Sequence, residues 1–201
     1  MKFLFQPIKP FIISQDFGED KVCFNGAGNL INKQTFASCP VGFTSLYHKT
    51  NGHNGLDLIA KRWQPVYAAA GGVVQEIQTE VERGLGCGIV TQVGDKYYKH
   101  RYWHFIALDC YVGEIVKTGD LIGYVDSTGY STGDHLHFEL KECTKSGATL
   151  NIGNGHLGAI DPKPYLFDTF ACDEQGKIKQ LTEIIAKLST ILADLLRRKT
   201  H

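Results

Sequence analysis

Residues 133–140 read GDHLHFEL, a run in which polar and apolar positions alternate. Its two histidines, His135 and His137, are two positions apart, and a leucine or a phenylalanine follows each of them. In a β-strand, side chains two positions apart point to the same face. The run therefore predicts a strand with two imidazoles side by side on one face. Two interpretations of the pair stay open: chance on a solvated strand, or a metal site in which one histidine is a ligand and the other carries protons.

Short β-forming runs continue through most of the 201-residue chain. From Asn51 onward, glycine or aspartate clusters separate these runs at intervals of roughly ten residues, as in β-sandwich and barrel-like domains. The runs are GLDLIA, VYAAAGGVVQEIQ, GIVTQVG, KYYKHRYWHFIAL, YVGEIV, LIGYVDS and HLHFELK. Helix and strand patterns do not alternate along the chain, which disfavours a parallel α/β fold. The sequence therefore predicts a mainly β domain.

The composition excludes several classes of partner. The chain has 21 Lys and Arg residues and 21 Asp and Glu residues, so no overall field attracts nucleic acid or an anionic membrane. No stretch approaches the length of a membrane-spanning helix. Pro7, Lys9 and Pro10 interrupt the N-terminal apolar run, and no small-residue cleavage site follows it. We therefore expect no signal peptide, and we expect this run to form the first strand region.

The six cysteines permit disulfides without requiring them. None of them forms a CxxC pair, which argues against a structural zinc knuckle. Cys23 and Cys39 flank the polar stretch FNGAGNLINKQTFAS and are the pair that we expect to bond if any pair does. Free thiols in a reducing cytosol remain the alternative.

The C-terminal segment differs in kind from the β region. Residues 173–199 contain one glycine, Gly176, and no proline, and their apolar residues recur at intervals of three and four, which predicts an α-helix. Two heptad positions are apolar throughout: Ile178, Ile185 and Leu192 in one, and Leu181, Leu188 and Leu195 in the other. This seam predicts a homo-oligomer held by residues 177–199. A single helix that folds back on its own β domain is the alternative.

A second histidine motif lies in GHNGLDL, residues 52–58, where His53 precedes Asp57 by four positions. Such a pair is common on protein surfaces, but its imidazole and carboxylate can also converge on one cation. Adding His137 gives three protein ligands, which with an open fourth position are typical of catalytic zinc and do not exclude manganese or cobalt. The segment YWHF contains a further histidine, His104, whose alternative interpretation is a satisfied histidine in an aromatic core segment.

Together these motifs resemble the lysostaphin/LytM-type zinc metallopeptidases, which cut peptide bonds in bacterial cell-wall peptidoglycan. The resemblance rests on GHNGLDL, PVYAAAGGVV, YYKHRYWHF and GDLIGYVDSTGYSTGDHLHFEL, within residues 47–141. It implies an antiparallel β-sheet metallopeptidase core of the duplicated hybrid motif type at 47–168, with the C-terminal α-helix at 173–199 outside the family pattern. Residues 1–46 are expected to pack on this core and to contain an insertion at 22–40.

The resemblance also implies roles for site residues. One zinc ion (Zn2+) per chain would be held by His53, Asp57 and His137. His104 and His135 would be the catalytic pair in metal-assisted amide hydrolysis, one taking a proton from the attacking water and the other stabilising the oxyanion or protonating the leaving amine. Tyr47 would help to hold the reacting carbonyl oxygen, with a packing tyrosine as the alternative. The sequence does not show which of the two histidines is the base, or which peptidoglycan bond is cut.

Two other functions remain as alternatives. The same fold could be a non-catalytic wall-binding or assembly module, which the intact ligand set argues against. It could also be a carrier domain of the sugar-transport type, where paired histidines handle phosphoryl groups, and Asp57 argues against that function. The expected partner is a stem or cross-bridge peptide of peptidoglycan. Without an export signal, a phage-type lysin, made in the cytoplasm and released through a holin or carried on a virion, is the expected route to the cell wall.

Overall fold

Strands form nearly all of the regular structure. The computed structural model describes residues 1–25, 30–32, 39–41, 43–47 and 49–170. Within these residues the one helical element is the 3₁₀ turn η1 (Lys163–Tyr165), and no helix there is long and apolar enough to cross a membrane. The predicted mainly β, antiparallel architecture is confirmed. The helix predicted at 173–199, with the oligomer-forming residues 177–199, lies outside the described residues.

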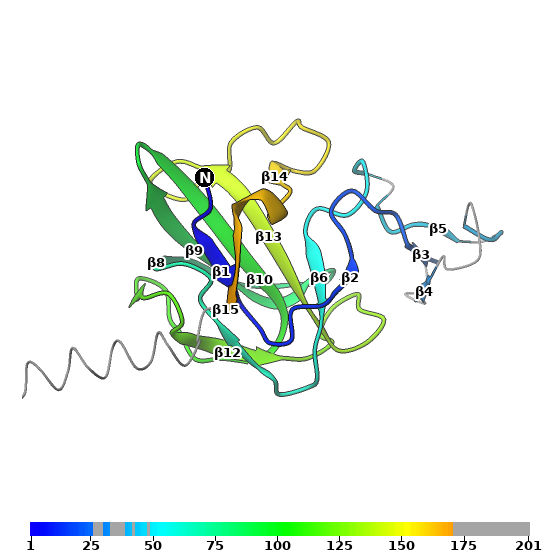
Figure 1. Ribbon diagram of the computed structural model, residues 1–201. Helices are drawn as coiled ribbons and strands as arrows, with labels where there is room; N and C mark the ends of the chain where they lie inside the picture. Colours follow the sequence, from blue (N-terminus) through cyan, green and yellow to red (C-terminus); the bar gives the residue numbers. More distant parts are fainter. Residues whose placement is uncertain (26–29, 33–38, 42, 48, 171–201) are drawn as a thin grey trace, which may run out of the picture. The chain divides into compact units, whose positions relative to one another are not determined.

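One largely antiparallel sheet carries the fold, with β10 (Lys96–Leu108) near its middle (Figure 1). β10 pairs with β9 (Gly84–Val93), β12 (Leu121–Val125) and β13 (His135–Cys143). Beyond β13 the sheet continues to β6 (Leu56–Ile59) and β2 (Ile13–Gln15), and beyond β9 to β8 (Gly72–Glu80) and β11 (Ile115–Val116). The short strands β7 (Pro65–Tyr67) and β14 (Ala159–Ile160) pair with β12 and β13. This order places the strand of the GHNGLDL motif directly beside the HLH strand.

Two smaller sheets complete the described structure. β1 (Leu4–Gln6) and β15 (Leu166–Phe170) form a parallel pair. β3 (Val22–Phe24), β4 (Leu30–Asn32) and β5 (Thr44–Ser45) form a three-stranded sheet. A disulfide joins Cys23 and Cys39, the pair that the sequence singled out. The segment predicted as an insertion at 22–40 therefore carries strands and a cross-link of its own.

Side chains on both faces of β13 are buried. Leu136, Phe138 and Leu140 are fully buried in the hydrophobic core, as the period of two predicted. Glu139 and Lys141, on the face of the histidines, are only 0% and 5% exposed. The alternative of a solvated strand is therefore wrong.

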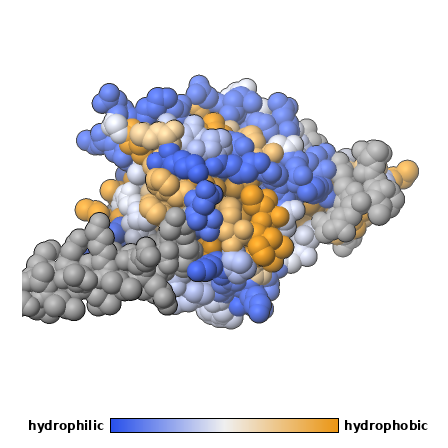
Figure 2. All heavy atoms as spheres, in the orientation of Figure 1, coloured by the Kyte–Doolittle hydropathy of each residue, from blue (hydrophilic) through white to orange (hydrophobic). Residues whose placement is uncertain are grey.

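Exposed residues of the molecule are mixed in character, and hydrophilic ones gather on the upper part of the face seen in Figure 2.

Inside the core, His100 of β10 is a neutral histidine with a partner on each ring nitrogen. The Tyr102 hydroxyl accepts from the Ala69 amide (2.8 Å) and donates its own proton to His100 Nδ1 (2.7 Å). The Thr91 hydroxyl donates to the Gly71 carbonyl (2.8 Å) and accepts from His100 Nε2 (2.8 Å). Burial lowers the pKa of His100 to about 3, so the neutral ring is the form that this network accommodates.

His100 should make the protein less stable in mild acid. Below its ordinary pKa of 6.5 the unfolded chain takes up a proton at His100, whereas the folded protein takes one up only near pH 3. The contribution of His100 is therefore complete above pH 6.5 and is lost as the pH falls toward 3, at up to about 1.4 kcal/mol per pH unit. Urea unfolding of metal-free wild type and His100→Gln should show their stability difference shrinking by about 2 kcal/mol between pH 7.5 and pH 5. A difference that does not change with pH would contradict this.

Candidate metal centre and catalytic cleft

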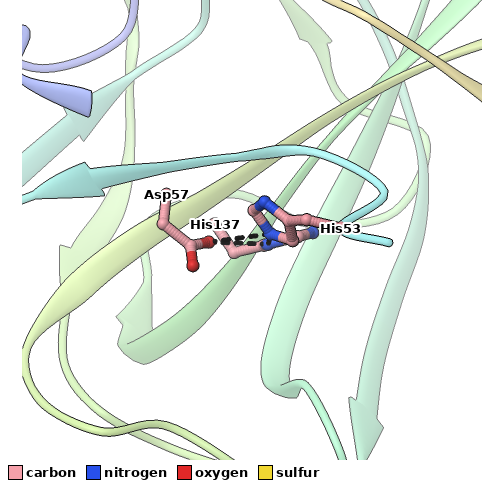
Figure 3. A group of neighbouring side chains, drawn as sticks. All are labelled: His53, Asp57 and His137. Carbon is pink, nitrogen blue, oxygen red and sulfur yellow. Dashed lines mark hydrogen bonds and ion pairs between the residues drawn. The ribbon is translucent and has the colours of Figure 1, made fainter. Parts of the chain in front are cut away.

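Three side chains converge where β6 pairs with β13 (Figure 3). Asp57 of β6 lies directly opposite His137 of β13 in the antiparallel ladder, so their side chains share one face of the sheet. His53 comes from the loop before β6, where its amide donates to the Glu19 carbonyl and its own carbonyl accepts from the Gly18 amide, each at 2.8 Å. A single strand pair thus joins the two histidine motifs.

The spacing of the three ligand atoms fits one zinc-sized ion. Asp57 Oδ1 is 2.9 Å from His137 Nδ1 and 3.1 Å from His53 Nε2, and the two nitrogens are 2.9 Å apart. Around a tetrahedral zinc ion with bonds of about 2.0–2.1 Å, neighbouring ligand atoms are about 3.3 Å apart. Both imidazoles are buried. Two nitrogens and one oxygen would fill three coordination positions of the ion and leave a fourth open for water or substrate.

Contacts outside the cluster determine which nitrogen of His53 faces it. Nδ1 of His53 donates to the Asp16 carbonyl (3.2 Å), since a carbonyl oxygen can only accept, and Nε2 is the nitrogen that faces Asp57. Burial alone would raise the pKa of Asp57, but His53, His135 and His137 hold it well below its ordinary value. An ionised carboxylate beside imidazole lone pairs is a donor set that suits a divalent transition metal.

His104 reaches the same site through an irregularity in β10. From Tyr102 to Phe105, three steps along β10 match two steps along β9, so β10 contains one extra residue, a β-bulge. Tyr102 and Phe105 both lie in the core, although strict alternation would place them on opposite faces. His104 within the bulge has a φ of 66°, in the left-handed region, and its side chain lines the cleft beside His135. His104 is therefore buried, as a core histidine would be, but it also lines the cleft.

His104 and His135 share one tautomer. Nδ1 of His104 donates to the Thr128 carbonyl (2.5 Å), and Nδ1 of His135 donates to the Gly133 carbonyl (2.7 Å). Each ring therefore keeps Nε2 as an acceptor, and that of His135 lies 3.5 Å from Asp57 Oδ1. Burial, reinforced by the neighbouring histidines, lowers the pKa of His104 to about 3. His104 is thus a neutral acceptor at neutral pH, beside the predicted metal ligands.

The cleft, with a volume of about 200 Å³, contains all the predicted site residues. Tyr47 lies against His53, with ring centroids 5.5 Å apart. Burial, with the nearby Asp57 charge, raises the pKa of Tyr47, so its phenol stays protonated and can donate a hydrogen bond. The residues that the structure brings together here are Tyr47, His53, Asp57, His104, His135 and His137. Their individual roles stay predictions.

Three residues that were not predicted from the sequence support this site. Glu139 and Asn54 contact each other and Glu139 contacts His137, while Asp16 holds His53 through its carbonyl. The period of two that linked the two histidines of β13 extends to Glu139 and would have placed it on their face. The contribution of Asp16 had no sequence signal, because it comes from a backbone carbonyl 37 positions before the histidine.

Gly55 should tolerate no side chain, because the loop that carries it packs directly on a predicted ligand. A Cβ at Gly55 would lie 2.6 Å from the Phe138 carbonyl oxygen and 2.9 Å from Cε1 and Nε2 of His137. We expect Gly55→Ala to destabilise the protein by roughly 1–3 kcal/mol, the usual range for overpacking, and to weaken metal binding. Gly153→Ala is the control, since a Cβ there meets nothing within 4 Å. Equal melting temperatures for the two variants would contradict the close packing at Gly55.

Comparisons with known proteins agree with the geometry. The family model described as Peptidase family M23 matches residues 51–151, which include both histidine motifs. Glycyl-glycine endopeptidase ALE-1 of Staphylococcus capitis is 34% identical over 115 residues, 57% of this chain and 29% of that protein. Peptidoglycan DD-endopeptidase ShyA of Vibrio cholerae is 32% identical over 143 residues, 70% of this chain and 31% of that protein. The chain spans less than a third of the length of these two curated relatives.

A solved structure shares the fold. A zinc-containing peptidase from Vibrio cholerae matches with a TM-score of 0.54 and covers 86% of this chain and 40% of its own. Its sequence identity to this chain is 22%, so the likeness concerns the fold alone.

Proposed function

Because the chain belongs to peptidase family M23, we propose that it is a zinc-dependent endopeptidase that hydrolyses peptide bonds in bacterial cell-wall peptidoglycan. The observation that carries this proposal is the convergence of Asp57, His53 and His137 on one point of a cleft, with atoms 2.9–3.1 Å apart. The two relatives described above are named for cleavage of glycyl-glycine and of peptidoglycan bonds, which supports a wall peptide as substrate.

In the proposed mechanism, His53, Asp57 and His137 hold the zinc ion. The ion, when bound, supplies a Lewis acid that activates water and polarises the scissile carbonyl. Nδ1 of His104 and Nδ1 of His135 each donate to a backbone carbonyl, so Nε2 is the nitrogen that each ring keeps for proton transfer. One ring takes the proton from the attacking water, and the pair then delivers a proton to the leaving amine. Tyr47, kept protonated by burial, donates to the carbonyl oxygen as negative charge develops there.

The test is turnover on purified peptidoglycan. Zinc-loaded protein is incubated with walls that have glycyl cross-bridges and with walls that are cross-linked directly between stem peptides, and released fragments are identified by mass spectrometry. The proposal expects new peptide amino and carboxyl ends at one type of bond. A protein that sediments with the walls but releases no fragments is instead a non-catalytic wall-binding module. Phosphoryl transfer to a histidine, with no metal bound, would favour the carrier-domain alternative.

The proposal extends to assembly through residues 177–199. Their apolar seam is expected to hold three or more copies together, which would raise avidity for a polymeric wall. Light scattering should give a mass of at least three chains for the full protein and of one chain for a protein ending at Asp173. Both forms should cleave a short soluble peptide equally well. A monomeric full-length protein would contradict the assembly and leave the catalytic proposal intact.

Delivery is the last part of the proposal. The enzyme would be made in the cytoplasm and act on the cell wall as a phage-type lysin, released at the end of infection or carried on a virion.

A further inference from the structure

Glu139 is a carboxylate buried behind the predicted metal centre. It lies on β13 two positions after His137 and is 0% exposed. A buried carboxylate loses its hydration and is stable only with charged or hydrogen-bonding partners. Three cations surround it: Arg101 Nη1 at 3.2 Å, Lys141 Nζ at 3.4 Å and Arg83 Nε at 3.4 Å. These cations hold Glu139 in one place and leave part of its Oε1 free for other contacts.

Oε1 of Glu139 faces Nε2 of the His137 ring. Oε1 of Glu139 is 3.3 Å from His137 Nε2, while Nδ1 of the same ring faces Asp57 and His53. Each nitrogen of this ring thus faces a carboxylate, Nδ1 that of Asp57 and Nε2 that of Glu139. A metal ion bound through the Nδ1 lone pair would leave the proton of the ring on Nε2, where the Glu139 carboxylate can accept it. The contact with Glu139 therefore supports the tautomer in which Nδ1 can be the ligand atom.

The same oxygen is also tied to the other ligand motif. Asn54 Nδ2 donates to Glu139 Oε1 at 2.8 Å, and Asn54 lies between His53 and Asp57 in the chain. One carboxylate oxygen thus contacts both the segment that carries two predicted ligands and the ring that supplies the third. A displacement of Glu139 would disturb the two segments together.

We infer that Glu139 is a positioning residue that holds the His137 imidazole in the orientation and tautomer needed to bind a divalent metal through Nδ1. The inference rests on the proposed metal-dependent function. Partners of this kind fix the ring orientation of metal-ligating histidines and make them better ligands. Replacing such a partner typically lowers metal affinity by about 10–100-fold.

The test measures Co2+ affinity in full-length, metal-free protein, by competition with a chelator and by the visible absorption of the bound ion. Glu139→Gln keeps the size of the side chain and removes its charge. Glu76→Gln is the matched control, because Glu76 also binds Arg101 (2.6 Å) and Lys99 (3.0 Å) but not the ring of His137. We expect Glu139→Gln to weaken Co2+ binding by about 10–100-fold and to change the absorption spectrum. Glu76→Gln should leave both as in wild type, even if it lowers the melting temperature.

Three results would overturn the inference. Unchanged Co2+ affinity in Glu139→Gln is the first, and an equal loss in Glu76→Gln is the second, because it would assign the effect to the charge network in general. Asn54→Ala covers the case in which Glu139→Gln does not fold, since it removes the donor that holds the same Oε1; unchanged affinity there is the third. A wild-type protein that binds no Co2+ contradicts the proposed metal centre itself, which is a different failure.

Discussion

A protein with alanine in place of His137 is expected to bind no stoichiometric metal and to release no fragments from peptidoglycan. His137 would supply one of three converging ligand atoms, and the other two, from His53 and Asp57, are 3.1 Å apart. Two ligands alone leave a divalent ion mostly hydrated and weakly held. Asp57→Asn, which keeps the shape of the side chain and removes its charge, should give the same result. Elemental analysis of the purified variants measures the loss.

Metal loss should also be visible in stability. An ion that binds only the folded protein adds about 4 kcal/mol when its free concentration is a thousand times its dissociation constant. Zinc should therefore raise the melting temperature of the wild type and have no effect on His137→Ala. Asp95→Asn, at an exposed turn between β9 and β10, is the control and should behave as wild type. A His137→Ala protein that keeps one equivalent of metal and full activity would exclude His137 from the ligand set.

Loss of His135 or His104 is expected to have a different signature, in which the metal stays and turnover falls. Neither ring belongs to the proposed three-ligand set, and Nδ1 of each is already bonded to a backbone carbonyl, which leaves Nε2 for proton transfer. A general acid or base contributes about 10²–10⁴-fold to rate, and His135→Ala should lose a factor in this range. For His104, whose φ is 66°, Asn is a better replacement than Ala because asparagine tolerates the left-handed region.

The control for both variants is metal content, measured in the same samples as turnover. His135→Ala and His104→Asn should each keep one equivalent of zinc and a melting temperature that rises with zinc. If His135→Ala loses metal as completely as His137→Ala, the roles assigned to the two histidines of β13 are reversed. If either variant retains full turnover, that residue has no catalytic role.

The residue pattern was sufficient to predict the strand of β13, and the family resemblance supplied the full set of residues that meet in the cleft. A period of two placed His135 and His137 on one face, and the four-residue spacing of His53 and Asp57 suggested a shared cation. The pairing of β6 with β13 brings these motifs together, although about 80 positions separate Asp57 from His137 along the chain. That pairing is tertiary structure, and only the family resemblance anticipated it. The C-terminal helix stays a prediction.

Two features of the site depended on information that the sequence does not display. The orientation of His104 results from a bulge and a left-handed backbone, whereas simple alternation places its side chain in the core with Tyr102. The charged residues of β13 look like a solvated face, yet Glu139 is buried and pairs with Arg101 of β10 and with Arg83 of the turn between β8 and β9. In both cases the outcome depends on neighbouring strands that are distant in sequence.

The most direct test of the account is a zinc titration of metal-free protein, in which new amino ends released from purified peptidoglycan are counted at each step. We expect no release without metal, a rise in rate in proportion to added zinc, and a plateau at one equivalent per chain. Full activity in metal-free protein, or no release at any amount of zinc, would contradict the claim that His53, Asp57 and His137 form a catalytic metal centre.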